Sequence, residues 1–177
     1  MEKLLNNRLY TLLLFPLLLG ALTVFSFQPF NFSIINFIIL PIFFYLTVYI
    51  KKKSKSIYRK KPLRKNLFIF GTAFGFGYYL SGIHWITYSL TFDESFKILI
   101  PFGLIFIPLF LSLFFSLITL TFGPFLNLNF LSMLIFSGSL GFSDYLRAKI
   151  LTGFPWNLWI YSFSWSPEII QILDKLG

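Results

Sequence analysis

Asp144 and Arg147 are the two residues whose types and spacing most directly suggest a charged site. They lie three positions apart, so on a helix they share one face and can form an ion pair. The planar guanidinium of an arginine also matches a phosphate group, which it binds through two parallel hydrogen bonds. The spacing fits a structural ion pair and a phosphate anchor equally well, and the sequence leaves both alternatives open.

The stretch that follows this pair combines bend-forming and aromatic residues, namely Gly153, Phe154, Pro155 and Trp156. Aromatic residues alone would indicate a girdle at a membrane–water interface. A girdle does not require glycine and proline, which fix a particular loop shape. The stretch therefore predicts a shaped aromatic loop that is suited to recognising an acyl chain or a lipid.

The single histidine, His84, lies near Ser81, Ser89 and Asp93, which together supply the residue types of a catalytic triad. No nucleophile elbow or oxyanion loop accompanies them, so we interpret His84 as an interfacial residue, with headgroup binding as the second alternative. The sequence contains no cysteine, and one histidine cannot build a multi-histidine metal site. We expect neither a metal nor a cofactor.

The composition indicates a membrane protein. Of the 177 residues, 56% are hydrophobic and only 12% are charged, with a net charge of +9. Soluble domains carry about 25% charged residues, so this chain cannot cover a soluble globule with ionic groups, and its apolar content excludes disorder. We expect an all-α membrane protein with one domain over residues 1–177. This would be a multi-pass helical bundle of about five spans with a re-entrant or interfacial aromatic loop and a short C-terminal helix. The expected spans lie near residues 9–27, 32–50, 67–90, 98–122 and 126–146.

The basic residues predict how these spans are oriented. Nine of the 15 lysines and arginines lie between Lys51 and Lys65. With the N-terminus in the cytoplasm, the cytoplasmic segments carry 11 basic residues and the outer segments carry four, as the positive-inside rule favours. We therefore interpret the basic stretch as an orientation determinant rather than as a nucleic-acid patch or a localisation signal, and we expect no nucleic-acid partner. We expect His84–Lys97 and Arg147–Gly177 to share the outer face.

One expected helix, near residues 67–90, carries small residues at a spacing of four. Gly71 and Gly75 form one row, and Ala73 and Gly77 form another. Small residues at this spacing let helix backbones approach closely. We expect this helix to lie at the centre of the bundle.

Three segments resemble the bacterial apolipoprotein N-acyltransferase family. The segment Asp144–Trp156, DYLRAKILTGFPW, is similar to the family's motif of an acidic residue, Leu-Arg and a Thr-Gly-Phe-Pro-Trp run. Ser81–Leu90, SGIHWITYSL, is similar to the segment that ends the family's third helix, and Phe25–Phe30, FSFQPF, to the end of its first helix. The resemblance runs through the whole chain in order.

This resemblance implies a multi-pass enzyme of the bacterial inner membrane whose active part faces the periplasm. Members transfer an acyl chain from a phospholipid to the N-terminal diacylglyceryl-cysteine of an apolipoprotein during lipoprotein maturation. Their chemistry uses a thioester on a cysteine, assisted by a glutamate and a lysine, in a carbon–nitrogen-hydrolase domain. In the family that domain follows the segment matched here, and we expect it to be missing from this chain.

We therefore expect the lipid-binding membrane part of such an enzyme, truncated or encoded short, with no catalytic residue and no activity alone. The alternatives are a non-catalytic scaffold and a subunit of a split acyltransferase. A transporter is disfavoured because the first and fourth expected spans contain no charged residue. The candidate lipid-binding residues are Trp85, Tyr88, Arg147, Phe154, Pro155 and Trp156. The expected structural residues are Gly71, Gly75, Gly77, Asp144 and Gly153.

Overall fold

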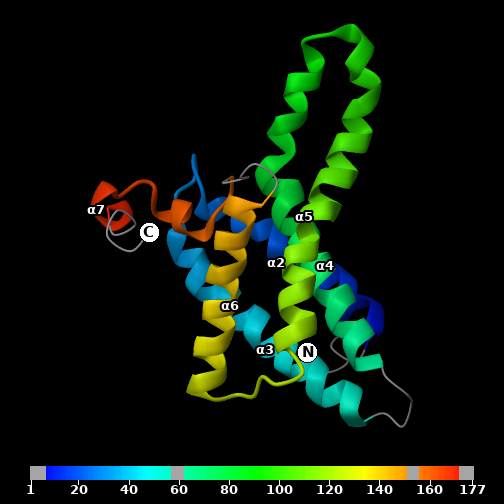
Figure 1. Cartoon of the computed structure of the whole chain (residues 1–177), viewed down its shortest axis with the longest axis vertical. Coiled ribbons are helices and arrows are strands. Elements are labelled where there is room, and N and C mark those ends of the chain that lie inside the picture. Colours follow the sequence, from blue (N-terminus) through cyan, green and yellow to red (C-terminus); the bar gives the residue numbers. More distant parts are fainter. Residues whose placement is uncertain (1–6, 57–61, 151–155, 172–177) are drawn as a thin grey trace.

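The structure, a computed structural model, describes residues 7–56, 62–150 and 156–171. Within these ranges all regular elements are helices and no strand occurs, as Figure 1 shows. The α-helices are α2 (Phe15–Leu22), α3 (Asn36–Ser56), α4 (Pro62–Ile83), α5 (Ile100–Phe122), α6 (Phe130–Lys149) and the short α7 (Pro167–Ile170). The element η1 (Tyr10–Leu14) is a short π-helix. The remaining elements are 3₁₀-helices, namely η2 (Thr23–Ser26), η3 (Ser33–Ile35), η4 (His84–Thr91), η5 (Glu94–Leu99) and η6 (Trp159–Phe163).

Helix α4 lies at the centre of the bundle and packs against α2 and α5. Its glycines set this packing. A Cβ atom at Gly71 would lie 2.8 Å from the Cα of Ser116 in α5, and one at Gly77 would overlap the carbonyl of Leu17 in α2. Without side chains at these points the backbones can meet directly.

The core around α4 is aromatic. The ring of Phe43 from α3 lies between 3.9 and 5.4 Å, centroid to centroid, from the rings of Phe70, Phe74 and Phe136. These side chains come from α3, α4 and α6, and each is at most 2% exposed. One stacked aromatic cluster therefore connects three helices, because large rings bury much apolar area and pack edge to face or offset.

Two helical stretches are long and apolar enough to cross a membrane, Ser33–Ser54 and Glu94–Phe122. Helix α5 also exposes bulky apolar side chains along its length. These are Phe102, Ile105, Phe106, Leu109, Phe110 and Leu113. A contiguous apolar surface of this kind is typical of contact with lipid or another protein. The expected class, an all-α helical membrane bundle, is confirmed, whereas the five crossings stay a prediction.

The helix ends differ from the expected spans. Helix α4 was expected to continue to residue 90, but the α-helix ends at Ile83 and η4 follows. The hydroxyls of Thr87, Ser89 and Thr91 donate to the carbonyls three residues earlier, at 2.7–2.8 Å. Such side-chain bonds compete with regular helix, and they favour the tighter turn.

The hairpin of α4, η4, η5 and α5 extends beyond the other helices at the top of Figure 1. The loop between α5 and α6 and the C-terminal end of α3 lie at the opposite end of the bundle. At that lower end Lys51 is buried, and its Nζ donates to the Leu126 carbonyl at 2.7 Å and to Asn127 Oδ1 at 3.0 Å. This lysine thus joins α3 to the α5–α6 loop.

Candidate functional site

Arg147, near the end of α6, holds the segment that follows it. The residue is 2% exposed, and its guanidinium donates to Asp144 Oδ1 at 3.0 Å, to the Asn157 carbonyl at 3.1 Å and to the Trp156 carbonyl. Of the two alternatives that the sequence left open, the Asp144–Arg147 ion pair is present in the structure. Because the guanidinium donates to two backbone carbonyls as well, it fixes the direction in which the chain leaves α6.

Asp144 fixes the same segment from a second point. Its Oδ1 accepts from Arg147, and its Oδ2 accepts the backbone N–H of Trp159 at 2.9 Å. Both carboxylate oxygens are thus occupied, one by a cation and one by the first residue of η6. Charge-assisted hydrogen bonds of this kind are the stronger ones in proteins.

Two tyrosines of α4, which were not among the predicted site residues, complete this network. The Tyr78 hydroxyl donates to the Asn157 carbonyl, and the Tyr79 ring lies 5.3 Å from the Arg147 guanidinium carbon in a cation–π contact. Both side chains are fully buried. An arginine over an aromatic face gains further stabilisation when water is excluded. The one signal in the sequence was their place in the glycine-rich helix.

Asn157 turns the chain at this point with a φ of +57°, in the left-handed region that asparagine tolerates better than most residues. Its side-chain amide lies directly against Gly82, where a Cβ atom would overlap it. The Asn157 side chain therefore packs directly against the backbone at the end of α4. We refer to Arg147, Asp144, Tyr78, Tyr79 and Asn157 as the Arg147 corner.

Two of the candidate lipid-binding residues meet above the Arg147 corner. The Trp85 and Trp156 rings lie 5.3 Å apart, centroid to centroid, edge to face at 83°. They stay 43% and 50% exposed, so the pair offers an aromatic surface rather than a filled core. Tyr88 is more exposed and contacts the His84 ring at 6.4 Å instead. Gly153, Phe154 and Pro155 lie outside the described residues.

The groups near His84 are not arranged as a triad. Its Nδ1 lies 2.9 Å from the Ser81 backbone carbonyl, and the ring is exposed. Asp93 accepts from the Ser95 amide at 2.8 Å and from its hydroxyl at 2.7 Å. These hydrogen bonds from Ser95 lower the pKa of the Asp93 carboxyl. His84 and Asp93 thus each bond locally, and the interpretation of His84 as an interfacial residue stays a prediction.

Comparisons with known proteins give the family. The model of the apolipoprotein N-acyltransferase N-terminal domain matches residues 19–177. The apolipoprotein N-acyltransferase of Rickettsia prowazekii (strain Madrid E) is 36% identical over 142 residues, which cover 79% of this chain and 28% of that protein. That of Rhodopseudomonas palustris (strain ATCC BAA-98 / CGA009) is 35% identical over 112 residues, covering 60% of this chain and 20% of that protein.

The matched part of the chain therefore spans little more than a quarter of the length of the first relative and a fifth of the second. The residues that the family model matches, 19–177, include the Arg147 corner and the Trp85–Trp156 pair of this chain. The helical bundle described above, with two helices able to cross a membrane, agrees with a membrane part of such a protein. The chain belongs to the apolipoprotein N-acyltransferase family and corresponds to its N-terminal domain.

Proposed function

We propose that this chain binds the phospholipid that donates the acyl chain in lipoprotein maturation, at the Trp85–Trp156 pair. The observation that carries this proposal is an exposed aromatic pair in which the backbone of Trp156 is held by the buried guanidinium of Arg147. An aromatic surface that is rigid and half-exposed suits an acyl chain, because little conformational entropy is lost when it binds. Tyr88, Phe154 and Pro155 stay further candidate lipid-binding residues.

The proposal gives Arg147 and Lys149 different tasks. The donors of Arg147 that face the turn bind carbonyls and Asp144, so this residue positions the aromatic loop. Lys149 is exposed two residues later, with its Nζ 5.8 Å from the centre of the Tyr145 ring. An exposed ammonium near a membrane interface can bind a headgroup phosphate, so Lys149 is the proposed phosphate partner.

In the proposed orientation the chain crosses the bacterial inner membrane several times, with its N-terminus in the cytoplasm. The hairpin tip and the Arg147 corner then face the periplasm. Support comes from the excess of basic residues near Lys51–Lys65 and from the contact between Trp85 and Trp156, which puts both segments at one end of the bundle.

The acyl-transfer step itself is proposed to lie outside these residues. The 177 residues include no cysteine to form a thioester, so the chain would present the lipid and exclude water from it. The acceptor, the diacylglyceryl-cysteine of an apolipoprotein, would meet the lipid only where a thioester-forming group is supplied. We expect no transfer of a labelled acyl chain to an apolipoprotein by this chain alone.

The proposal is tested by replacing one tryptophan of the pair. Trp156→Ala should weaken binding of phosphatidylethanolamine to the purified chain about fivefold or more, because an exposed aromatic contact is lost. Trp165→Ala is the matched control, since Trp165 is 52% exposed and lies outside the pair. Equal losses of lipid binding in the two variants would indicate that the pair is only part of an ordinary aromatic girdle. That result would refute the proposal.

A further inference from the structure

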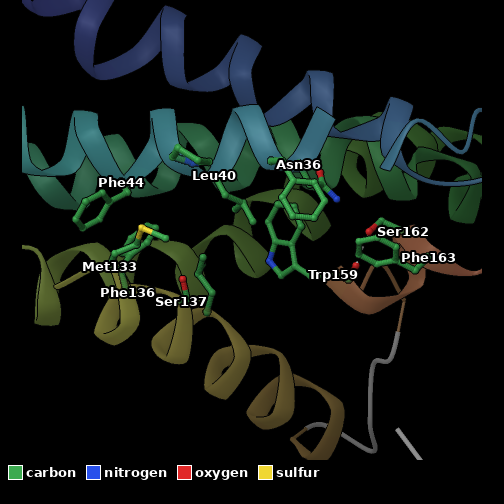
Figure 2. Close-up of a pocket in the computed structure, with 12 residues that line it drawn as sticks. Asn36, Leu40, Phe44, Met133, Phe136, Ser137, Trp159, Ser162 and Phe163 are labelled. Atoms are coloured by element: carbon green, nitrogen blue, oxygen red, sulfur yellow. Dashed lines mark hydrogen bonds between the residues drawn. The ribbon is translucent and has the colours of Figure 1, made fainter. Parts of the chain in front are cut away.

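Two grooves on the bundle differ in the charge of the residues beside them. The groove between α3 and α6 is lined also by η6, and Figure 2 shows Met133, Ser137 and Trp159 among its side chains. None of the residues that line it is charged, so its contacts do not favour one occupant over another. The other groove, of about 410 Å³, lies between η1, α2, α4 and α5 and has basic residues at one end.

The walls of this second groove are apolar. They are formed by aliphatic and aromatic side chains of the four elements, namely Leu13, Leu17, Phe68, Ile69, Phe76 and Leu109. The hydroxyl of Thr72 also lines the groove, but it bonds to the Phe68 carbonyl at 2.9 Å and to Ser116 Oγ at 2.7 Å. The groove therefore suits a carbon chain and offers no unpaired polar group along its length.

Two exposed cations of α4 lie at one end of the second groove. Arg64 precedes Phe68 by four residues, and Lys65 precedes Ile69 by four. Residues four apart on a helix lie one above the other on the same face. Each cation is therefore one helical turn from an apolar residue of the groove wall.

Arg8 joins these two cations from the N-terminal segment. Its guanidinium donates to Asn66 Oδ1 at 3.0 Å, and the Asn66 amide donates to Ser54 Oγ at 3.0 Å. Within the described ranges this is the one hydrogen bond of the exposed Arg8 side chain. A guanidinium has five N–H donors, so Arg8 can donate to a ligand beside the start of α4.

The three cations lie at the depth of lipid headgroups. The apolar stretch Ser33–Ser54 has 22 residues. At 1.5 Å per residue it is about 33 Å long, close to the thickness of a hydrocarbon layer of about 30 Å. Its last residue, Ser54, bonds to Asn66 of α4. Arg8 and the start of α4 are therefore beside the end of a helix that can cross the membrane, where phosphate groups are found.

We infer that the second groove binds one acyl chain of an anionic phospholipid, whose phosphate accepts hydrogen bonds from Arg8, Arg64 and Lys65. Guanidinium and ammonium groups only donate, and the charged oxygens of a phosphate accept, so the two sides match. The Trp85–Trp156 pair lies at the opposite end of α4, so this site is separate from the proposed donor site and does not rest on it. In the proposed orientation the lipid belongs to the cytoplasmic leaflet, which is rich in anionic lipid.

The cations favour a lipid over a further helix as the occupant. The two ion pairs in the described part of the chain, Lys97–Glu94 and Arg147–Asp144, involve none of the three cations. A helix packed in the groove would cover its apolar walls and leave these cations without a counter-charge. An anionic phospholipid joins an apolar chain to a phosphate, so a single molecule matches both the groove and the charges at its end.

The test uses the whole chain in vesicles of phosphatidylethanolamine and phosphatidylglycerol. The probe is a phosphatidylglycerol with a diazirine in its acyl chain, and the adducts are mapped by mass spectrometry after irradiation. We expect adducts on residues 13–17 and 68–76. A phosphatidylcholine with the same acyl chain should label these residues about fivefold less, since it has no net negative charge. Equal labelling by the two probes overturns the assignment of an anionic lipid.

Lys65→Gln tests the charged end of the groove. It should reduce labelling of residues 68–76 about fivefold, the effect of one cation near anionic lipid. Lys52→Gln is the matched control, since Lys52 is exposed at the end of α3, which does not line this groove. It should change the labelling by less than about twofold, because only the general surface charge changes. Equal losses in the two variants would indicate attraction by net charge and overturn the inference.

Leu13→Trp tests the apolar part, because it fills the groove from η1 and should reduce the adducts on residues 68–76 to background. Leu14→Trp is its control, since Leu14 is the next residue, is 49% exposed and does not line the groove. Equal labelling of the two variants contradicts the inference. Absence of adducts from both segments also contradicts it, and a disulfide-linked dimer of Leu13→Cys in this cysteine-free chain would then identify a second copy as the occupant.

Trp156→Ala separates this inference from the proposed function. The variant changes the aromatic pair at the other end of α4, so the adducts on residues 13–17 and 68–76 should stay unchanged. A parallel loss of these adducts would assign the probe to the aromatic pair and overturn the inference. The proposed function is judged by its own binding measurement, so the failure of one does not imply the failure of the other.

Discussion

Arg147 donates a hydrogen bond from its guanidinium to the backbone carbonyl of Trp156, nine residues later in the chain. The ring that would contact lipid is thus carried by a residue whose backbone is held by a buried cation. Asp144 and the Tyr79 ring balance the charge of that cation. The position of the exposed Trp156 ring therefore depends on the interactions of a buried guanidinium.

Arg147→Lys should destabilise the chain by about 2–3 kcal/mol, because an ammonium cannot reach Asp144 and both carbonyls in the fork geometry. Unfolding in a denaturing detergent, followed by tryptophan fluorescence, measures this loss. Lys149→Gln removes a nearby exposed charge and should change stability by less than about 0.5 kcal/mol. A loss for Arg147→Lys as small as that of the control would mean that the network does not hold the loop.

The sequence alone does not decide whether Arg147 forms an ion pair with Asp144 or binds a phosphate. The spacing of Asp144 and Arg147 allows the ion pair that the structure shows, but it left the phosphate anchor equally open. It contains no information on the carbonyls of Trp156 and Asn157, which reach the guanidinium only once the chain has turned. Every residue has a backbone carbonyl, so the residue types do not indicate which carbonyls accept hydrogen bonds from Arg147. The hydrogen-bond network around Arg147 could therefore not be predicted from the sequence.

The helices were easier to predict than their ends and their polar contacts. Long apolar runs indicate α3 and α5 because few other structures suit them in a membrane. Lys51 was predicted as part of a basic orientation signal, but the structure shows it buried and bonded to the Leu126 carbonyl. The sequence does not distinguish Lys51 from the other lysines of the basic stretch. Its burial follows only from the packing of the helices.

Close backbone contact at Gly75 should make this position intolerant of any side chain. A Cβ atom there would lie 2.8 Å from the Cα of Ser112 in α5. Gly75→Ala should therefore cost about 1–3 kcal/mol, as overpacking in a rigid core does. The same unfolding assay applies, with Gly138→Ala as the control. That substitution meets no neighbour within 4 Å and should be neutral or stabilising by up to about 1 kcal/mol. Similar costs at both positions would contradict close packing of α4 on α5.

Lys51→Met should loosen the loop between α5 and α6. The change removes the ammonium that donates to the Leu126 carbonyl and to Asn127, and it leaves a buried carbonyl unsatisfied at a cost of about 1–3 kcal/mol. Hydrogen exchange of the amides at residues 126–132 should become faster. Lys52→Met removes the same charge from an exposed position and should leave this exchange unchanged. Faster exchange in both variants would assign the effect to charge instead of to the hydrogen bonds.

Lys149 should contribute to lipid binding through charge, because its ammonium is exposed while Arg147 is enclosed. Lys149→Gln should weaken binding of vesicles that contain phosphatidylglycerol by about fivefold at low salt, since an exposed cation near anionic lipid contributes about 1 kcal/mol. The difference should shrink as salt rises, because a higher ionic strength screens exposed charges. Lys97→Gln serves as the control, since Lys97 already pairs with Glu94 on the hairpin. An equal effect of the two variants would show general attraction by net charge. An effect confined to Lys149→Gln would give the headgroup a specific partner beside the aromatic pair.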